Sequence, residues 1–448
     1  MAATIIDSTL FGDVFSTAAM RGVWSDETRV AQYLVFEAAL AKVQGALGVI
    51  PAEAAAEIER VCRVGNIDRV LLKAQTERAG TPIVGLVAQI NGLCRDGLGE
   101  YSHWGATTQD VTDTATVLQI AAALALVDAE LQAVGNGLAK LARTHRDTPM
   151  VGRSKLQQAV PVTFGYKMAG LLSAVQRHRE RLAQLRPRVL QAEFAGAAGT
   201  LASLQGAAMQ TQQALCAELG LAQPVIAWHT QRDGIAEVGA FLGLVGGTLG
   251  KLALDVKLLM QTEVGEVFEP AAPGRGSSST MPHKRNPVAC NVIHAAISVV
   301  RQHAASLLEA MVADHERSTG PWEIEWIVLP EAFCLLAGAL AQSRVLVEGL
   351  EVDADRMRAN LDMTHGLVVA EAVMMGLAPA LGREHAHHRV SALCRAATQQ
   401  RRPLLDLLAA DAEIAAHATR EQLAAMCEPA GYLGQSGAMV DRVLAHWQ

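Results

Sequence analysis

The residues with the clearest chemical potential lie in one loop, from Gly274 to Pro287, which reads GRGSSSTMPHKRNP. Its glycines permit backbone conformations that other residues disfavour, and successive backbone N–H groups there would form a nest that binds an anion. Serine is a poor base unless its alkoxide is stabilised, and such donors, helped by Lys284, would supply that stabilisation. Asn286 would add a donor to a carboxylate. The loop therefore predicts acid–base chemistry on a carbon beside a carboxylate.

A flexible Gly/Ser linker is the alternative, but linkers rarely end in Met-Pro-His-Lys-Arg-Asn-Pro between two apolar segments. Loops at the ends of rigid helices commonly present catalytic groups, so other polar segments between long apolar stretches are further candidates. They are SHWGATTQD (102–110), GRSKLQQAVPVTFG (152–165) and WHTQRD (228–233).

Composition favours helices as the elements that position these loops. Only 4% of the 448 residues are aromatic, whereas alanine and leucine recur throughout, and strands prefer aromatic and β-branched residues. The net charge is −7 with acids and bases interspersed, so no basic face for nucleic acid or an anionic membrane is expected. An anionic substrate would be held by local charge.

Apolar periodicity and breakers divide the chain into three predicted helical domains, 1–110, 111–350 and 351–448. A helix is expected over 25–49, where Ser25 is a plausible N-cap. Longer helices are expected over 111–147, 161–185, 233–263, 288–312 and 330–349, and their apolar residues occupy more than one face. The sequence therefore predicts an all-α protein with a central long-helix bundle, shared between the subunits of an oligomer.

Targeting and metal signals are weak. The N-terminus lacks the pattern of a signal peptide, and the apolar run 238–250 is shorter than the roughly 20 residues of a membrane span, so a cytoplasmic protein is expected. The seven cysteines are scattered, which argues against disulfides or a zinc site. His385 and His388 would share a helix face, but no carboxylate ligands accompany them, so no metal is expected.

The loop GSSSTMPHKRNP resembles the signature loop of the fumarase/aspartase superfamily. HWGATTQDVTDTA and GRSKLQQAVPVTFG are similar to its first and second substrate-binding segments, so the resemblance covers nearly the whole chain. It implies a homotetramer with active sites composed of segments from three subunits, and no cofactor. The catalytic serine falls on Ser278, six residues before Lys284, although Ser277 replaces the glycine that usually precedes it.

The resemblance also implies a set of substrate-binding residues, for which structural roles are the alternatives. Thr107 and Thr108 would bind carboxylate oxygens at a helix N-terminus, with Asp110 or Asp113 as structural caps, and capping alone is the alternative. Arg232 would contact substrate or pair with Asp233. The further candidates are His103, Lys155, Gln231, Met281, Lys284, Asn286 and Arg317.

A second departure from the superfamily narrows the reaction. Most of its lyases carry a histidine in the second segment, where this chain has Ser154 and Lys155. Elimination needs a group there to handle the leaving group, whereas lactonisation does not, because the substrate's own carboxylate is the nucleophile. The sequence therefore favours lactonisation of a small tricarboxylate, with Lys155 offsetting its charge. A fumarate-releasing lyase such as adenylosuccinate lyase, and a catalytically silent structural protein, are the alternatives.

Overall fold

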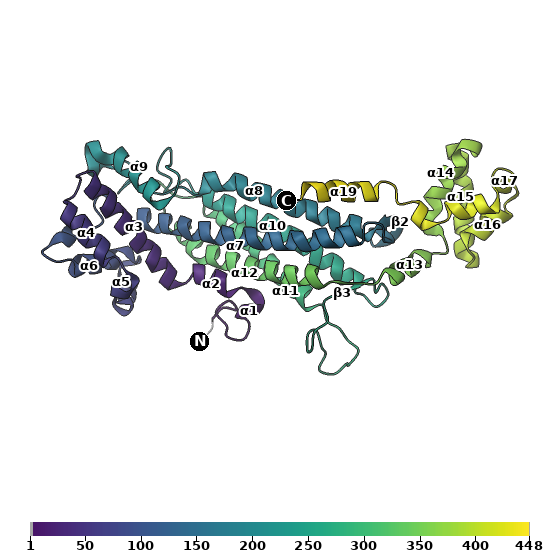
Figure 1. Cartoon of the computed structure of the whole chain (residues 1–448), viewed down its shortest axis with the longest axis horizontal. Helices are drawn as coiled ribbons and strands as arrows, with labels where there is room; N and C mark the ends of the chain where they lie inside the picture. Colours follow the sequence, from purple (N-terminus) through teal and green to yellow (C-terminus); the bar gives the residue numbers. More distant parts are fainter. Residues whose placement is uncertain (1–2, 448) are drawn as a thin grey trace. The chain divides into compact units, whose positions relative to one another are not determined.

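Helices make up about two thirds of the protein, as shown by the computed structural model, which describes residues 3–447 (Figure 1). The prediction of an all-α fold is confirmed. The chain forms two compact units, each assembled from three stretches. The first unit comprises Met1–Leu131, His178–Leu249 and Val292–Ala341, and the second comprises Gln132–Arg177, Gly250–Asn291 and Gln342–Gln448.

Five long helices contribute residues to both units. They are α7 (Thr108–Thr144), α8 (Phe164–Val189), α10 (Asp233–Leu259), α11 (Val288–Glu309) and α12 (Pro321–Gly349). Each lies where the apolar pattern predicted a long helix, but α12 begins nine residues earlier than expected. Pro321 suits a first turn, where its missing N–H costs no bond, whereas Pro330 lies inside the helix.

The first unit has a core of apolar side chains that includes Phe36, Leu86 and Phe194, and most of its remaining helices contribute to it. The remaining helices are α1 (Gly12–Phe15), α2 (Ala18–Val23), α3 (Asp26–Ala46), α4 (Ala52–Val61), η1 (Val64–Asn66), α5 (Arg69–Ala79), α6 (Ile83–Leu93), η2 (Leu98–Tyr101), η3 (Ala202–Ala207) and α9 (Ala208–Leu219). The helix predicted over 25–49 is α3, and the side chain of Ser25 caps it by accepting a hydrogen bond from Thr28 N at 3.2 Å.

The second unit contains two short antiparallel sheets and a cluster of shorter helices. Its other elements are β1 (Pro149–Ser154), β2 (Gln157–Thr163), β3 (Val267–Phe268), β4 (Glu351–Val352), α13 (Ala354–Asp362), η4 (Leu367–Val369), α14 (Ala370–Leu381), α15 (Arg383–Gln400), α16 (Leu404–Ala410), α17 (Ala412–Ala415), α18 (Arg420–Met426), η5 (Pro429–Gly431) and α19 (Ser436–His446). The segment 152–165, expected to be a polar loop, mostly forms the β1–β2 hairpin. The β-branched residues Val160 and Val162 favour a strand, although Pro161 between them does not.

Three helices in the described part of the chain, α7, α10 and α12, are long and apolar enough by composition to cross a membrane, and the bent pair α13 and η4–α14 passes the same test together. The most apolar stretch of each single helix is already 44%, 56% and 67% buried within the chain, in that order. Much of the remaining apolar surface of these helices is exposed on a single chain. Within the part of a single chain that the structure describes, nothing covers this apolar surface.

Candidate functional site

The start of α7 carries a carboxylate that ties three loops of the first unit together. Asp110 is fully buried, and it accepts hydrogen bonds from Thr107 N at 3.0 Å, Ala195 N at 3.1 Å and Gly196 N at 3.0 Å. A fourth contact joins it to His229 Nε2 at 2.6 Å. Asp110 therefore caps α7 and fixes the loops around residues 195 and 229 to it.

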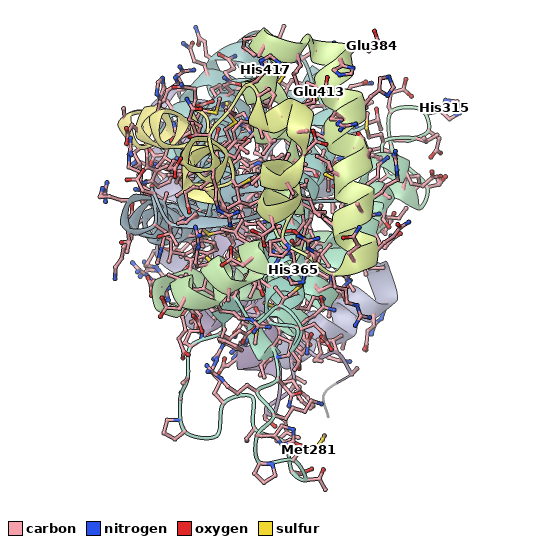
Figure 2. All side chains as sticks on the ribbon, turned by 90° about the vertical axis from the view of Figure 1, so that its right-hand side faces the viewer. Met281, His315, His365, Glu384, Glu413 and His417 are labelled. Atoms are coloured by element: carbon pink, nitrogen blue, oxygen red, sulfur yellow. The ribbon has the colours of Figure 1, made fainter. Side chains whose placement is uncertain are left out.

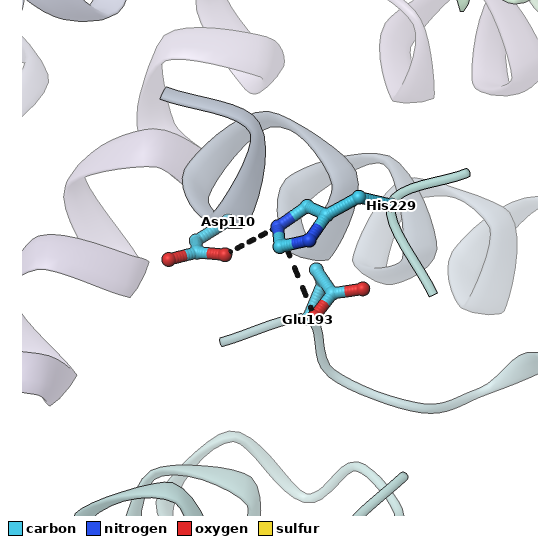
Figure 3. Close-up of side chains that lie close together, drawn as sticks. All are labelled: Asp110, Glu193 and His229. Atoms are coloured by element: carbon cyan, nitrogen blue, oxygen red, sulfur yellow. Dashed lines mark hydrogen bonds and ion pairs between the residues drawn. The ribbon is translucent and has the colours of Figure 1, made fainter. Parts of the chain in front are cut away.

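Figure 3 shows that Asp110, His229 and Glu193 form one buried cluster. Glu193 Oε2 accepts a hydrogen bond from Trp228 N at 2.6 Å, whereas Oε1 has no hydrogen-bond partner among the described residues and lies 3.9 Å from His229 Nε2. Burial raises the pKa of Glu193 to about 9, against the lowering effect of the Trp228 hydrogen bond. At neutral pH Glu193 is therefore a neutral acid beside an engaged carboxylate.

The three side chains have the types and spacing of a metal site, because their ligand atoms lie within 4.8 Å of one another. Asp110, however, already accepts three backbone N–H groups and contacts the imidazole. A metal would have to displace the short contact between Asp110 and His229. The chemistry of the donor set fits a hydrogen-bonded network that positions loops.

Around this network lie several side chains that the sequence singled out. Arg317 donates from Nη2 to Gly196 O at 2.6 Å, so it is connected to Asp110 through one residue. Since Asp110 caps the helix, the hydroxyl groups of Thr107 and Thr108 are not used as caps and have no hydrogen-bond partner among the described residues. Gln231 is exposed. The first unit thus brings a helix N-terminus, two threonines and an arginine to connected loops.

Arg232 is engaged by two buried carboxylates and is 2% exposed. Its guanidinium contacts Asp113 at 2.6 Å and 3.2 Å, and Glu325 Oε1 at 2.9 Å. Asp113 also accepts from Trp322 Nε1 at 3.0 Å. The structural ion pair envisaged for Arg232 therefore has different partners from the neighbouring Asp233. Burial alone would lower the pKa of Arg232, but the charges of Asp113 and Glu325 outweigh it and raise that pKa.

A cavity of about 580 Å³ lies beside this ion-pair network in the first unit. Asp113, Glu325 and Trp322 line it, together with apolar and aromatic side chains from α3, α5 and α12. None of the sequence-predicted site residues is in its lining. Two of its three cationic residues, Arg29 and Lys73, pair with the neighbouring acids Asp26 and Glu77.

His103 lies in the loop before α7, and its Nδ1 is 2.6 Å from Glu37 Oε1. Glu37 comes from α3 and is 1% exposed. From the sequence, Asp110 or Asp113 was expected to cap α7, but neither Glu37 nor the cluster that Asp110 forms with Glu193 and His229 was singled out. His103 also adopts a left-handed backbone with φ of 58°, a conformation that histidine adopts more often than most other residue types.

The signature loop belongs to the second unit, and its serines differ in their hydrogen bonds. Ser278 Oγ accepts from Met281 N at 3.1 Å and from Thr280 N at 3.3 Å. Ser277 Oγ instead donates to Gly274 O at 3.0 Å. Two backbone donors directed at one hydroxyl oxygen are what an alkoxide needs for stabilisation. The geometry therefore distinguishes Ser278 from the adjacent Ser277.

The backbone of the loop is held at Gly276, which has φ of 68°. Asn286 donates to Gly276 O from its backbone N at 2.8 Å and from Nδ2 at 3.1 Å. A Cβ at position 276 would lie 2.6 Å from Asn286 O, so only glycine fits this close approach. Asn286 is thus occupied in shaping the loop.

Buried and paired charges fix the two ends of the loop. Glu269 accepts from Ala289 N and Cys290 N at the start of α11, at 3.0 Å and 2.9 Å. Arg285 makes a bidentate pair with Glu351 of β4. Between these anchors the chain is exposed, and Figure 2 shows Met281 at the far end of the protruding loop. Lys284 is exposed as well.

Lys155 occupies the turn of the β1–β2 hairpin and is exposed. Lys155 and Leu156 both have left-handed backbones, with φ of 51° and 64°. Near this turn the hairpin is fixed by Arg153, which makes a bidentate contact with the buried Glu266 at 2.6 Å and 2.9 Å. The predicted residues therefore fall into two groups, with His103, Thr107, Thr108, Gln231, Arg232 and Arg317 in the first unit and Lys155, Ser278, Met281, Lys284 and Asn286 in the second.

Comparison with known proteins identifies relatives along the full chain. Residues 12–301 match the family described as lyase, and residues 366–443 match the family described as adenylosuccinate lyase C-terminus. Trans-aconitate decarboxylase 1 of Mycosarcoma maydis is 54% identical over 433 residues, which cover 97% of this chain and 88% of that protein. The 3-carboxy-cis,cis-muconate cycloisomerase of Pseudomonas aeruginosa is 51% identical over 439 residues, covering 97% and 96%.

A solved structure has the same fold. The 3-carboxy-cis,cis-muconate lactonizing enzyme from Pseudomonas putida matches with a TM-score of 0.93 and 44% identity, over 98% of this chain and 99% of that one. The likeness therefore extends over both compact units of the chain.

Proposed function

The chain belongs to the lyase family, and from this premise we propose that it lactonises 3-carboxy-cis,cis-muconate to 4-carboxymuconolactone. The observation that carries the proposal is the pair of backbone N–H groups directed at Ser278 Oγ, in a chain without a histidine in the second segment. A serine hydroxyl with a stabilised alkoxide can deliver a proton to carbon. Lactonisation requires one such delivery and no separate group to activate a nucleophile.

The reaction is an intramolecular addition, so no group of the substrate is lost. The C6 carboxylate attacks C3 and forms the C–O bond of the lactone. The electron pair of the C2–C3 double bond moves toward the C1 carboxylate, which becomes an aci-carboxylate. Ser278 then gives its proton to C2, and the serine alkoxide recovers a proton from water. Well-oriented intramolecular attack can lower a barrier by roughly 7–11 kcal/mol, so the protein needs mainly to orient and neutralise the substrate.

We assign the neutralising groups from the two sets of loops. Thr107 and Thr108 would bind one carboxylate at the N-terminus of α7, where the helix dipole favours negative charge. Lys284, Lys155 and Arg317 would offset the remaining charge. Gln231 and Met281 complete the substrate contacts, with Asn286 shaping the catalytic loop. We propose that Arg232 acts through its buried pairs, by keeping the adjacent Gln231 in place.

A second candidate reaction has its own support. The relative with 54% identity is named for decarboxylation of trans-aconitate, which is also an unsaturated tricarboxylate. Decarboxylation breaks a C–C bond and then needs a proton on carbon, so a serine loop of this kind would serve both reactions. The two differ in product, because lactonisation retains all three carboxyl carbons.

We further propose a cytoplasmic homotetramer. The support is the apolar surface left exposed on the long helices, because such patches on a soluble chain mark contacts with another protein. Examples are Leu244 and Leu254 on α10, Leu308 on α11 and Ile327 on α12, with exposed fractions of 52%, 45%, 53% and 64%. Further copies of the chain would bury these side chains and complete sites that draw on several subunits.

The test is to incubate the purified protein separately with 3-carboxy-cis,cis-muconate, trans-aconitate and adenylosuccinate, and to identify the products. The proposal expects loss of the conjugated-diene ultraviolet absorbance of the muconate and formation of its lactone. Stable diene absorbance at high enzyme concentration, with CO2 released from trans-aconitate, would establish the second candidate instead. Fumarate released from adenylosuccinate would establish a lyase.

A further inference from the structure

His103 has a left-handed backbone, which is uncommon outside glycine, although histidine adopts it more often than most residue types. Its φ of 58° lies in the left-handed region, where residues other than glycine persist only if their surroundings hold them. Such residues cluster at functional sites. His103 lies in the turn before α7, which begins at Thr108 and has Asp110 in its first turn.

Two buried residues of α3 hold this loop. Glu37 Oε1 contacts His103 Nδ1 at 2.6 Å, and Gln44 Nε2 donates to Trp104 O at 2.8 Å. Glu37 and Gln44 are 1% and 0% exposed. Being seven residues apart, they lie on the same face of α3, two turns from each other. Helix α3 thus binds two consecutive loop residues, His103 and Trp104, through buried side chains.

The contact decides which nitrogen of His103 remains available. With Nδ1 engaged by Glu37, the proton resides on Nδ1, and Nε2 has no hydrogen-bond partner among the described residues. The side chain is 20% exposed. Within the described part of the chain, the Glu37 carboxylate forms its hydrogen bond to His103 through Oε1, and its buried Oε2 has no partner. A buried carboxylate engaged at one oxygen favours a cation beside it.

The electrostatic surroundings favour the same state. Burial alone would lower the pKa of His103, but the charge and hydrogen bond of Glu37 on α3, with a smaller contribution from Asp110 on α7, outweigh it and raise that pKa. The thiol of Cys62, after α4, also faces Glu37, and burial followed by the charge of Glu37 raises its pKa, so this thiol adds no negative charge. Both acids that face His103 therefore stabilise the imidazolium.

We propose that Glu37 is a positioning residue that holds His103 as an oriented imidazolium, whose Nε2–H binds a carboxylate of the unsaturated tricarboxylate. The inference rests on the proposed function for the identity of the ligand. The contact between Glu37 and His103 does not depend on which tricarboxylate is used, so the two proposals can fail separately.

The experiment compares wild type with Glu37→Gln, which keeps the shape and removes the charge. Protein labelled with 13C at the histidine ε1 carbon is titrated, and the His103 resonance is identified by its loss in His103→Asn. Glu37→Gln should lower the His103 pKa, reduce kcat/KM at neutral pH by about 10- to 100-fold and do so mainly through KM. Because the cation then forms only at lower pH, kcat/KM should recover as the pH is lowered.

Glu57→Gln is the matched control, since Glu57 is a buried carboxylate of the same unit that pairs with Arg60 and Arg95. It should leave the His103 titration unchanged. Glu37→Asp retains the charge and should restore part of the raised pKa, which keeps the test decisive if Glu37→Gln folds poorly. An unchanged His103 titration and pH profile in the Glu37 variants would overturn the inference. If wild type converts none of the substrates, the proposed function fails, and the titration alone still decides the role of Glu37.

Discussion

At the residue scale, the signature loop assigns different tasks to two adjacent serines. Ser278 Oγ accepts two backbone hydrogen bonds, whereas Ser277 donates to a carbonyl within the loop. A positioned general acid contributes about 10²- to 10⁴-fold to rate, so Ser278→Ala should lower kcat by that factor. Ser277→Ala is the matched control and should keep kcat near that of wild type. Steady-state kinetics of both variants decide this, and near-normal turnover by Ser278→Ala would remove it from the chemistry.

A second prediction at this scale concerns the buried acid Glu193. Its folded pKa, raised to about 9 by burial, lies far above that of an exposed glutamate. Between those values the folded protein retains a proton that the unfolded chain releases. The free energy of unfolding should therefore fall as pH rises from about 5 to 9, by about 1.4 kcal/mol per pH unit for this group.

Glu193→Gln replaces the titrating carboxyl group with an amide. The free energy of unfolding should then depend less on pH between about 5 and 9. Urea unfolding followed by helical circular dichroism across the pH range measures it. Glu53→Gln, a replacement of an exposed glutamate on α4, should leave the slope as in wild type. An equally steep slope in Glu193→Gln would contradict the protonation assigned to the cluster.

At the element scale, the sequence predicted the long helices well because their signal is local. Ser25 was expected to cap α3 and does so through Thr28 N. The hairpin β1–β2 was missed because its strands are short, and its turn places Lys155 and Leu156 in the left-handed region that normally selects glycine or asparagine. A turn without glycine or asparagine at its left-handed positions carries no sequence signal for a hairpin.

The same turn yields a stability prediction. The left-handed conformation costs a non-glycine residue roughly 1–2 kcal/mol, while glycine adds about 0.4–1 kcal/mol of unfolded-state entropy. Leu156→Gly should therefore raise the free energy of unfolding by up to about 1 kcal/mol. Leu10→Gly is the control, because Leu10 is equally exposed, at 81%, without a positive φ. Denaturant unfolding that gives the same destabilisation for both variants would refute the strain.

The site was harder to predict than the helices, for a related reason. The signature loop and the pair of threonines at the start of α7 are each a short continuous segment, so a sequence motif identifies each of them. Asp110, Glu193 and His229 are distant from one another along the chain and meet only through folding. Glu37 lies on a helix that the pattern assigns to core packing, and the three-domain division made from the sequence stays a prediction.

At the scale of the whole molecule, the exposed apolar residues of the long helices predict association. Ile327 on α12 is 64% exposed, and a charge there would be buried without a partner in a tetramer. Ile327→Glu should shift the mass in solution from four chains toward smaller species and reduce activity in parallel. Val70→Glu is the control, since Val70 is 82% exposed and belongs to the short helix α5 rather than to one of the long helices. Light scattering that gives a monomeric wild type would contradict the assembly.

The central claim is that the protein adds a substrate carboxylate intramolecularly and delivers one proton to C2. It is tested most directly by converting 3-carboxy-cis,cis-muconate in D2O and examining the product by proton NMR. The account predicts a lactone that retains all three carboxyl carbons and carries a single deuterium at C2, formed on one face, with formation suppressed in Ser278→Ala and not in Ser277→Ala. Release of CO2, a product lacking deuterium at C2, or no conversion of the muconate would contradict it.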